Sequence, residues 1–243
     1  MEIEGKTALV TGAAHRLGRA IAIGLAEQGC DVAVHYHASQ DQACSTTAEI
    51  CSKGVRAVSL QADLSTSAGV RLLFDQLDRQ FSRLDILVNS AAVMLPVGLL
   101  KATEQDWQQT IDLNLKGAFF CLQEAARRMR THRSGAIVNI SDLAASRPWV
   151  RFPIHSISKS GVEMLTQVAA LALAPDIRVN AIAPGPVLKP DPMSEQRWGR
   201  IGAALPASRS GAPADIVGAV LFLLQNDFIT GETLAVDGGG QLV

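Results

Sequence analysis

Short apolar runs alternate with amphipathic stretches along the whole chain. The runs cover residues 6–10, 31–36, 55–60, 84–90, 135–141, 177–183 and 233–238. Each is rich in β-branched residues and bounded by polar, Gly or Pro residues, which is typical of β-strands. Their nearly continuous apolarity predicts parallel strands that are buried on both faces.

The stretches between these runs have helical spacing. Leu17, Ile21 and Leu25 recur every four residues within segment 17–29, and segment 162–173 has a similar pattern. Strand–helix alternation from end to end predicts an α/β fold, a Rossmann-like doubly wound parallel sheet with helices on both faces. We therefore expect a single domain over residues 1–243.

One segment, 185–206, breaks this alternation. It is rich in Pro, Gly and charged residues and has no clear period. Long irregular segments in compact domains are usually functional or disordered. Two interpretations remain open, a lid that covers a substrate and a passive surface loop, and we take 185–206 as the candidate lid.

Composition excludes several classes of function. The net charge is −1 and no basic stripe is present, so we expect no nucleic-acid partner. No apolar stretch approaches the roughly 20 residues that cross a bilayer, which predicts no membrane partner. Residues 1–6 are acidic without an apolar signal region, and the four cysteines form no C-x-x-C pair. These features predict a cytoplasmic protein with reduced thiols and no metal.

The first predicted strand runs into the sequence TGAAHRLGRA, where Gly12 and Gly18 flank a strand-to-helix turn. Backbone amides and a helix N-terminus at such a turn can hold a pyrophosphate. The spacing is not G-x-G-x-x-G, so the glycines alone are a weak signal. Their place at the first such turn of an alternating chain favours a dinucleotide site.

The end of the second predicted strand indicates which dinucleotide binds. An acid there would bind the ribose hydroxyls and repel a 2′-phosphate, but residues 35–39 read HYHAS, with no acid before Asp41. Arg16 can reach the same space. An arginine, a hydroxyl and the imidazoles of His35 and His37 favour a phosphate, so we predict NADPH as the cofactor.

Taken together, these motifs resemble the short-chain dehydrogenase/reductases over essentially the full length of the chain. The pteridine-reductase branch is the most similar, because its members carry T-G-A-A-x-R-[LI]-G followed by an HYHxS-like strand end. The motifs occur in order as TGAAHRLG (11–18), VHYHAS (34–39), QADLS (61–65), LVNSAA (87–92), LNLKG (113–117), IVNISD (137–142), HSISK (155–159), VNAIAPG (179–185) and ITGETLAVDGG (229–239).

The resemblance implies a set of cofactor residues. Those expected around the diphosphate and adenosine ribose are Gly12, Arg16, Leu17 and Gly18, with His37 and Ser39 at the 2′-phosphate, Asp63 and Leu64 at the adenine, and Asn89, Ala91, Pro184 and Gly185 on the nicotinamide side. It also implies a small-molecule substrate and a homotetramer or homodimer.

The catalytic residues implied by the resemblance come from three motifs. Lys159 would bind the nicotinamide ribose, Asn114 would hold a water beside it, and Ser141 would hydrogen-bond the substrate. Asp142 matches an acid that pteridine reductases place beside the substrate.

The chain also departs from the family pattern. Arg16 replaces a glycine, as is normal in the pteridine-reductase branch, while Ser90 and Ala92 alter the common N-N-A-G. Met94 stands where a phenylalanine stacks on the pterin, and a thioether is not a flat stacking partner. His155 stands where the catalytic tyrosine is expected.

Four roles for His155 remain open. Lys159 would disfavour an imidazolium, so we expect a neutral ring, which can donate one N–H to a carbonyl oxygen or act as a base. Asp142, if adjacent, would favour a His–Asp pair that acts as an acid. The ring could also fill the tyrosine's volume without reacting. The chain contains one tyrosine, Tyr36, on the cofactor strand, so no tyrosine mechanism is available.

The leading hypothesis is an NADPH-dependent reductase that acts on a pterin-like C=N or a small carbonyl compound. An alternative is an NADP(H)-binding sensor or partner subunit without turnover, although the joint presence of Asn114, Ser141 and Lys159 argues against it. Another is a non-redox enzyme of this fold in which His155 is a base.

Overall fold

A seven-stranded, fully parallel sheet forms the centre of the computed structural model, which describes residues 1–243. The strands are β1 Thr7–Val10, β2 Asp31–Tyr36, β3 Ala57–Gln61, β4 Ile86–Asn89, β5 Gly135–Ile140, β6 Ile177–Pro184 and β7 Thr233–Val236. Their order across the sheet is β3-β2-β1-β4-β5-β6-β7. All seven predicted strands are confirmed, with ends within two residues of the predicted ones.

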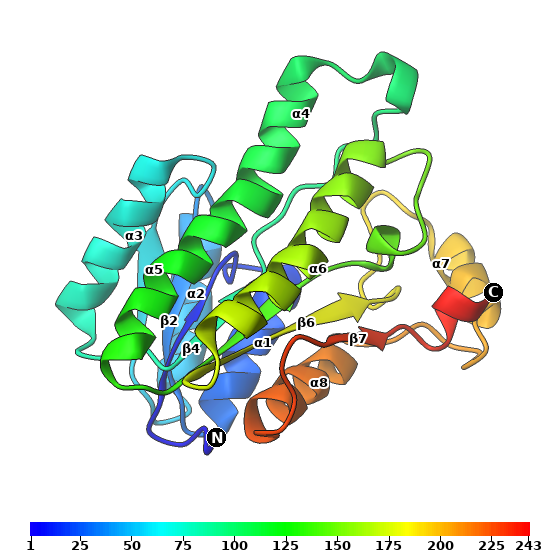
Figure 1. Ribbon diagram of the computed structural model, residues 1–243. Helices are drawn as coiled ribbons and strands as arrows, with labels where there is room; N and C mark the ends of the chain where they lie inside the picture. The colour runs from blue at the N-terminus through cyan, green and yellow to red at the C-terminus, as the bar shows by residue number, and fades with distance from the viewer.

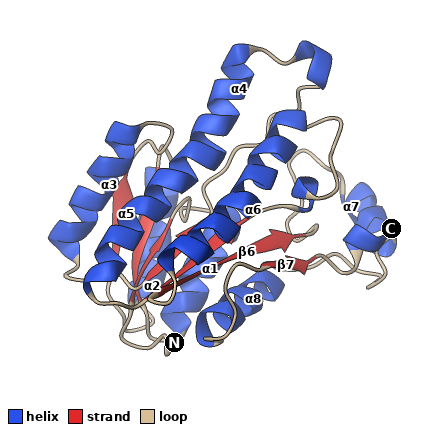
Figure 2. Ribbon diagram, in the orientation of Figure 1, coloured by secondary structure: helices blue, strands red, loops and turns tan.

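Helices cover both faces of the sheet (Figure 1) and enclose the strands in a single layer (Figure 2). On one face α1 packs between α2 and α8, and on the other α5 packs between α3 and α6. The helices are α1 Arg16–Glu27, α2 Gln40–Cys51, α3 Ser67–Gln80, α4 Glu104–Ile111, α5 Ala118–Thr131, α6 Pro153–Leu173, α7 Glu195–Ala203 and α8 Pro213–Gln225. The predicted doubly wound α/β fold is therefore confirmed.

Each face of the sheet has its own apolar core. Leu25 and Ile50 are fully buried on the α1 side, and Phe74 and Met129 are fully buried on the α5 side. Burying one such side chain stabilises a fold by about 1.5–3 kcal/mol. These two layers hold the strand ends, and the loops that follow them, in fixed positions.

The parallel arrangement brings the carboxyl ends of all the strands to one edge. Strand order reverses between β1 and β4, where the loops that follow the strands diverge to opposite faces. Such a switch point leaves a crevice that binds ligands in open α/β sheets. The residues that follow β1, β2, β4 and β5 therefore lie where a dinucleotide is expected.

Two sequence predictions of local structure need correction. Helix α6 begins at Pro153, so residues 153–161 are helical ahead of the predicted segment 162–173. Segment 185–206, predicted to be irregular, contains helix α7, which Ser194 caps by accepting a hydrogen bond from the Arg197 N–H. Only Trp198 and Ile201 give α7 an apolar side, which is too little for a visible period. None of the helices is both long and apolar enough to cross a bilayer.

Candidate active site

The turn after β1 depends on close backbone packing at two glycines. Gly12 has a φ of +65°, and a Cβ there would lie 2.9 Å from the Ala91 Cα. A Cβ on Gly18 would lie 2.3 Å from the Gly12 carbonyl oxygen. Only glycine fits both positions, so the turn can approach a pyrophosphate at the start of α1.

His35 stabilises this turn from behind, which corrects its predicted contribution to the phosphate site. The ring is buried, Nδ1 accepts a hydrogen bond from the Gly12 N–H at 3.0 Å, and Nε2 lies 3.1 Å from the Ala62 carbonyl oxygen. Burial lowers the pKa of His35 to about 4, so the ring is neutral and donates from Nε2. Both nitrogens are occupied by backbone groups, and His35 is a positioning residue.

The surface next to this turn can accept a phosphate. Arg16 and His37 are exposed, and Ser39 is the N-cap residue of α2 but makes no side-chain capping bond. Arg16 has a φ of 54°, which is uncommon for a residue with a Cβ. Leu17 packs against the core below. A guanidinium at the start of α1, and an imidazole and a free hydroxyl just before α2, are groups that fit a 2′-phosphate.

Asp63 holds the loop after β3, where the adenine is expected. Its Oδ1 accepts hydrogen bonds from the Ser65 hydroxyl at 2.7 Å and the Ser65 N–H at 2.9 Å, and the hydroxyl bond lowers the pKa of Asp63. Leu64 is buried beside it. The second oxygen of Asp63 makes no hydrogen bond and remains available to an amino group.

A small hollow joins the cofactor segments to the catalytic ones. Its lining includes Leu64, Asn89, Ala91, Asn114 and Lys159. Residues from strand ends far apart in sequence thus meet there, as a nicotinamide pocket requires. Across the sheet, Pro184 ends β6, and a Cβ on Gly185 would lie 2.5 Å from the Asp237 Cα, so this glycine lets two loops pack closely.

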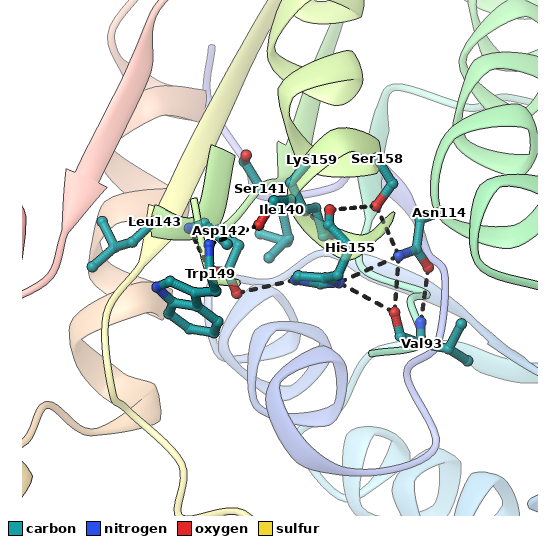
Figure 3. A network of polar contacts seen from close by, with 12 residues as sticks. Val93, Asn114, Ile140, Ser141, Asp142, Leu143, Trp149, His155, Ser158 and Lys159 are labelled. Atoms are coloured by element: carbon teal, nitrogen blue, oxygen red, sulfur yellow. Dashed lines mark hydrogen bonds and ion pairs between the residues drawn. The ribbon is translucent and has the colours of Figure 1, made fainter. Parts of the chain in front are cut away.

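His155 lies at the centre of a polar network (Figure 3). Its ring is 5% exposed, and Nδ1 lies 3.2 Å from the Val93 carbonyl oxygen. Nε2 faces Asp142 Oδ2 at 3.5 Å and has no hydrogen-bond partner. The other Asp142 oxygen accepts a hydrogen bond from the Ala144 N–H at 2.8 Å, which fixes the carboxylate. The sequence left open whether His155 and Asp142 are adjacent, and the structure places them side by side.

Asn114 fixes the tautomer of His155. It lies in η2, a π-helical segment (Asp112–Gly117) between α4 and α5. Its amide donates hydrogen bonds to the Val93 carbonyl oxygen at 2.9 Å and to the Ser158 hydroxyl at 3.1 Å, and it accepts one from the Val93 N–H at 2.8 Å. The amide nitrogen also lies 3.5 Å from His155 Nδ1, but its two shorter bonds, to Val93 and Ser158, use both amide hydrogens. The hydrogen between His155 Nδ1 and Val93 must come from the ring, which leaves Nε2 as the free nitrogen.

Lys159 and Ser141 are the remaining two of the predicted catalytic residues. The Lys159 ammonium donates a hydrogen bond to the Ile140 carbonyl oxygen at 2.7 Å, and burial lowers the pKa of Lys159 to about 8. The Ser141 hydroxyl donates to Glu163 Oε1 at 2.9 Å. Burial raises the pKa of Glu163. The helix α6 thus supplies His155, Lys159 and Glu163 at four-residue intervals along one face.

Comparison with known proteins agrees with this geometry. A family model described as "Enoyl-(Acyl carrier protein) reductase" matches residues 12–241. The 3-oxoacyl-(acyl carrier protein) reductase FabG of Staphylococcus aureus is 38% identical over 239 residues, which cover 96% of this chain and 97% of that protein. The chain belongs to the short-chain dehydrogenase/reductase family.

Two further members of the family extend the comparison. The 2-dehydro-3-deoxy-D-gluconate 5-dehydrogenase of Escherichia coli K12 is 36% identical and covers 98% of this chain and 96% of that protein. The solved structure of landomycin C-6 ketoreductase LanV, with bound NADP and rabelomycin, has a TM-score of 0.89 at 30% identity and covers 100% of this chain and 98% of that one. The present chain is accordingly an NAD(P)-dependent oxidoreductase.

Sequence reasoning about this short-chain dehydrogenase/reductase missed Glu163. A signal was available, because Glu163 follows Lys159 by one helical turn and so shares its face of α6. The predicted residues Asn114, Ser141, Asp142, His155 and Lys159 do lie together (Figure 3). Met94 follows Val93 at the same end of the sheet and is 41% exposed, available to a substrate.

Proposed function

We propose that the protein is an NADPH-dependent reductase that transfers a hydride to a ketone or a pterin-like C=N, with His155 as the proton donor where the family has a tyrosine. The observation that carries this proposal is the pair formed by His155 Nε2 and Asp142 Oδ2, 3.5 Å apart. The ketoreductase and reductase activities named for its relatives favour a carbonyl substrate over a C=N.

The cofactor is NADPH. Arg16, His37 and Ser39 fit its 2′-phosphate, and LanV, which is similar over the whole chain, carries bound NADP. When bound, the nicotinamide supplies the hydride at the hollow lined by Asn89 and Lys159. Lys159 would hold the nicotinamide ribose, and its ammonium also donates a hydrogen bond to the Ile140 carbonyl oxygen.

Proton donation requires a charged imidazole. A neutral His155 carries its single hydrogen on Nδ1, where Val93 accepts it, so Nε2 offers only a lone pair. The protonated ring carries a second N–H, on Nε2, which faces Asp142. As the hydride reaches the substrate carbon, Nε2 gives this proton to the substrate oxygen. Asp142, whose side chain is 23% exposed, stabilises the imidazolium and connects it to water.

The same geometry supports a second candidate function. The unpaired Nε2 of a neutral His155 is a ready base, suited to alcohol oxidation or to an isomerase or lyase step without net redox change. A protein that binds NADP(H) without turnover is the third candidate.

Two surface features belong to the proposal. Segment 185–206, with α7 in it, is the candidate lid over the substrate. On α6 the side chains of Met164, Val168 and Leu171 are 58%, 54% and 85% exposed, and a homodimer or homotetramer would cover them.

The test is NADPH oxidation by the purified protein with small ketones, quinones and dihydropterins. At least one of these acceptors should be reduced, and His155→Gln should abolish that turnover while NADPH still binds. Tight NADPH binding without turnover on any acceptor would favour a sensor. Substrate consumption without net NADPH oxidation would favour a non-redox enzyme.

A further inference from the structure

The hydroxyl of Ser141 is oriented by a carboxylate outside the predicted catalytic set. Ser141 directly follows β5, and its N–H donates to the Ile182 carbonyl oxygen at 2.7 Å, so its backbone is fixed. Its side chain is buried and donates to Glu163 Oε1 at 2.9 Å. A serine hydroxyl has one hydrogen and two lone pairs, and here the hydrogen is already committed.

Glu163 has no other partner that would explain its position. It makes no ion pair, and Ser141 is the only group that hydrogen-bonds its carboxylate. Its side chain lies half-buried on the face of α6 that carries His155 and Lys159. An ionised carboxylate can only accept hydrogen bonds, so it holds the Ser141 hydrogen away from any substrate.

We propose that Glu163 is a positioning residue that makes Ser141 a hydrogen-bond acceptor towards the substrate. Ser141 then presents a lone pair beside the reacting carbon, while the imidazolium of His155 donates to the reacting oxygen or nitrogen. A lone pair there repels a bare carbonyl oxygen and attracts an O–H or N–H on a neighbouring atom. The preferred substrates are therefore α-hydroxy ketones or C=N compounds with an adjacent N–H. This inference rests on the reductase function proposed above.

The test compares two ketones that differ only in the predicted donor, 3-hydroxybutan-2-one and butan-2-one, at neutral pH. The wild-type protein should prefer the hydroxy ketone by about tenfold in kcat/KM, the scale of one hydrogen bond in a desolvated site. Glu163→Met removes the acceptor and frees the Ser141 hydrogen, so the preference should disappear. Glu163→Gln keeps an acceptor oxygen and should retain it. Gln167→Met, an exposed change one turn further along α6, is the matched control and should retain it too.

A merely structural role predicts a different result. Glu163→Met would then lower kcat/KM equally for both ketones, and the ratio would stay as in the wild type, which overturns the proposal. If Glu163→Gln loses the preference for the hydroxy ketone as fully as Glu163→Met does, the acceptor role is overturned as well.

A binding measurement distinguishes failure of the reductase function from failure of the role proposed for Glu163. If neither ketone is reduced, calorimetric titration of both ketones into the protein saturated with NADP⁺ measures the same discrimination without hydride transfer. About tenfold tighter binding of the hydroxy ketone, lost in Glu163→Met, supports the role of Glu163. Equal binding of the two ketones by the wild type refutes it.

Discussion

The two sides of the switch point hold their functional groups in different ways. On the cofactor side, side chains hold the loops by hydrogen bonds to backbone groups. His35 accepts one from the Gly12 N–H, and the Thr11 hydroxyl accepts two, from the N–H groups of Ser90 and Ala91 at 2.9 and 3.1 Å. On the catalytic side, side chains also bind one another, as in the pairs Ser141–Glu163 and His155–Asp142.

This difference shows where the chemistry can change without loss of the fold. A loop shaped by backbone packing keeps its shape whatever the exposed residues are. A network of side chains can exchange a member, and with it a proton donor, while β5 and α6 keep their positions. We therefore expect substitutions on the catalytic side to alter turnover selectively, and those on the cofactor side to alter affinity or stability.

After the His155→Gln test, the largest expected effect comes from Asp142→Asn. The asparagine oxygen can keep the bond from the Ala144 N–H, which turns its amide nitrogen towards His155 Nε2. An N–H donor there stabilises the neutral ring and removes the acid, so kcat for reduction should fall by about 100-fold or more. Steady-state kinetics measures this, with NADPH affinity as the companion readout. Asp78→Asn, in an exposed pair with Arg128, is the control and should leave kcat unchanged. Similar losses in both variants would argue against a specific role.

Gly18→Ala tests the cofactor side by forcing its backbone apart. The new Cβ would lie 2.3 Å from the Gly12 carbonyl oxygen, and that clash should displace the turn. Overpacking of this kind costs about 1–3 kcal/mol, so NADPH affinity should fall by up to about 100-fold. Fluorescence titration with NADPH measures it. Gly218→Ala in α8 meets no atom within 4 Å and should stabilise the protein without changing affinity.

His35 offers a finer test, because each ring nitrogen can be replaced separately. His35→Asn places an acceptor near the Nδ1 position and should retain the Gly12 bond, whereas His35→Gln should lose it. An unsatisfied Gly12 N–H costs about 1–3 kcal/mol, which predicts about tenfold weaker NADPH binding in the glutamine variant only. Equal affinity in both variants would show that the turn does not need this bond.

The same residue predicts a pH dependence of stability. Burial lowers the pKa of His35 from 6.5 to about 4, so between these values the unfolded state binds more protons than the folded state. Stability is therefore complete above pH 6.5 and falls as the pH drops towards 4, by at most about 3 kcal/mol from this group. Denaturant unfolding of the wild type and His35→Asn across this range should show a larger loss of stability in the wild type.

The accuracy of the sequence predictions follows the same division. Gly12 and Gly18 could be placed from strand order, because backbone packing at the first turn demands glycine. His35 was misassigned because parallel strands are buried on both faces, so alternation does not tell which way a side chain points. Glu163 was missed because its partner, Ser141, comes from another element 22 residues away. The beginning of α6 was missed because segment 153–161 carries serines and a glycine in place of an apolar period.

Arg16→Gly has the smallest expected effect and separates strain from binding. Arg16 and Arg133 have φ values of 54° and 51°, and relief of this left-handed conformation should stabilise each glycine variant by about 1 kcal/mol. Arg133 makes one highly exposed ion pair, with Asp176, whose loss matters little. Only Arg16 lies beside the proposed 2′-phosphate site, so only Arg16→Gly should also lose about fivefold in NADPH affinity, with NADH binding unchanged. Equal stabilisation of both variants without that loss would remove Arg16 from the phosphate site and leave His37 and Ser39 to define it.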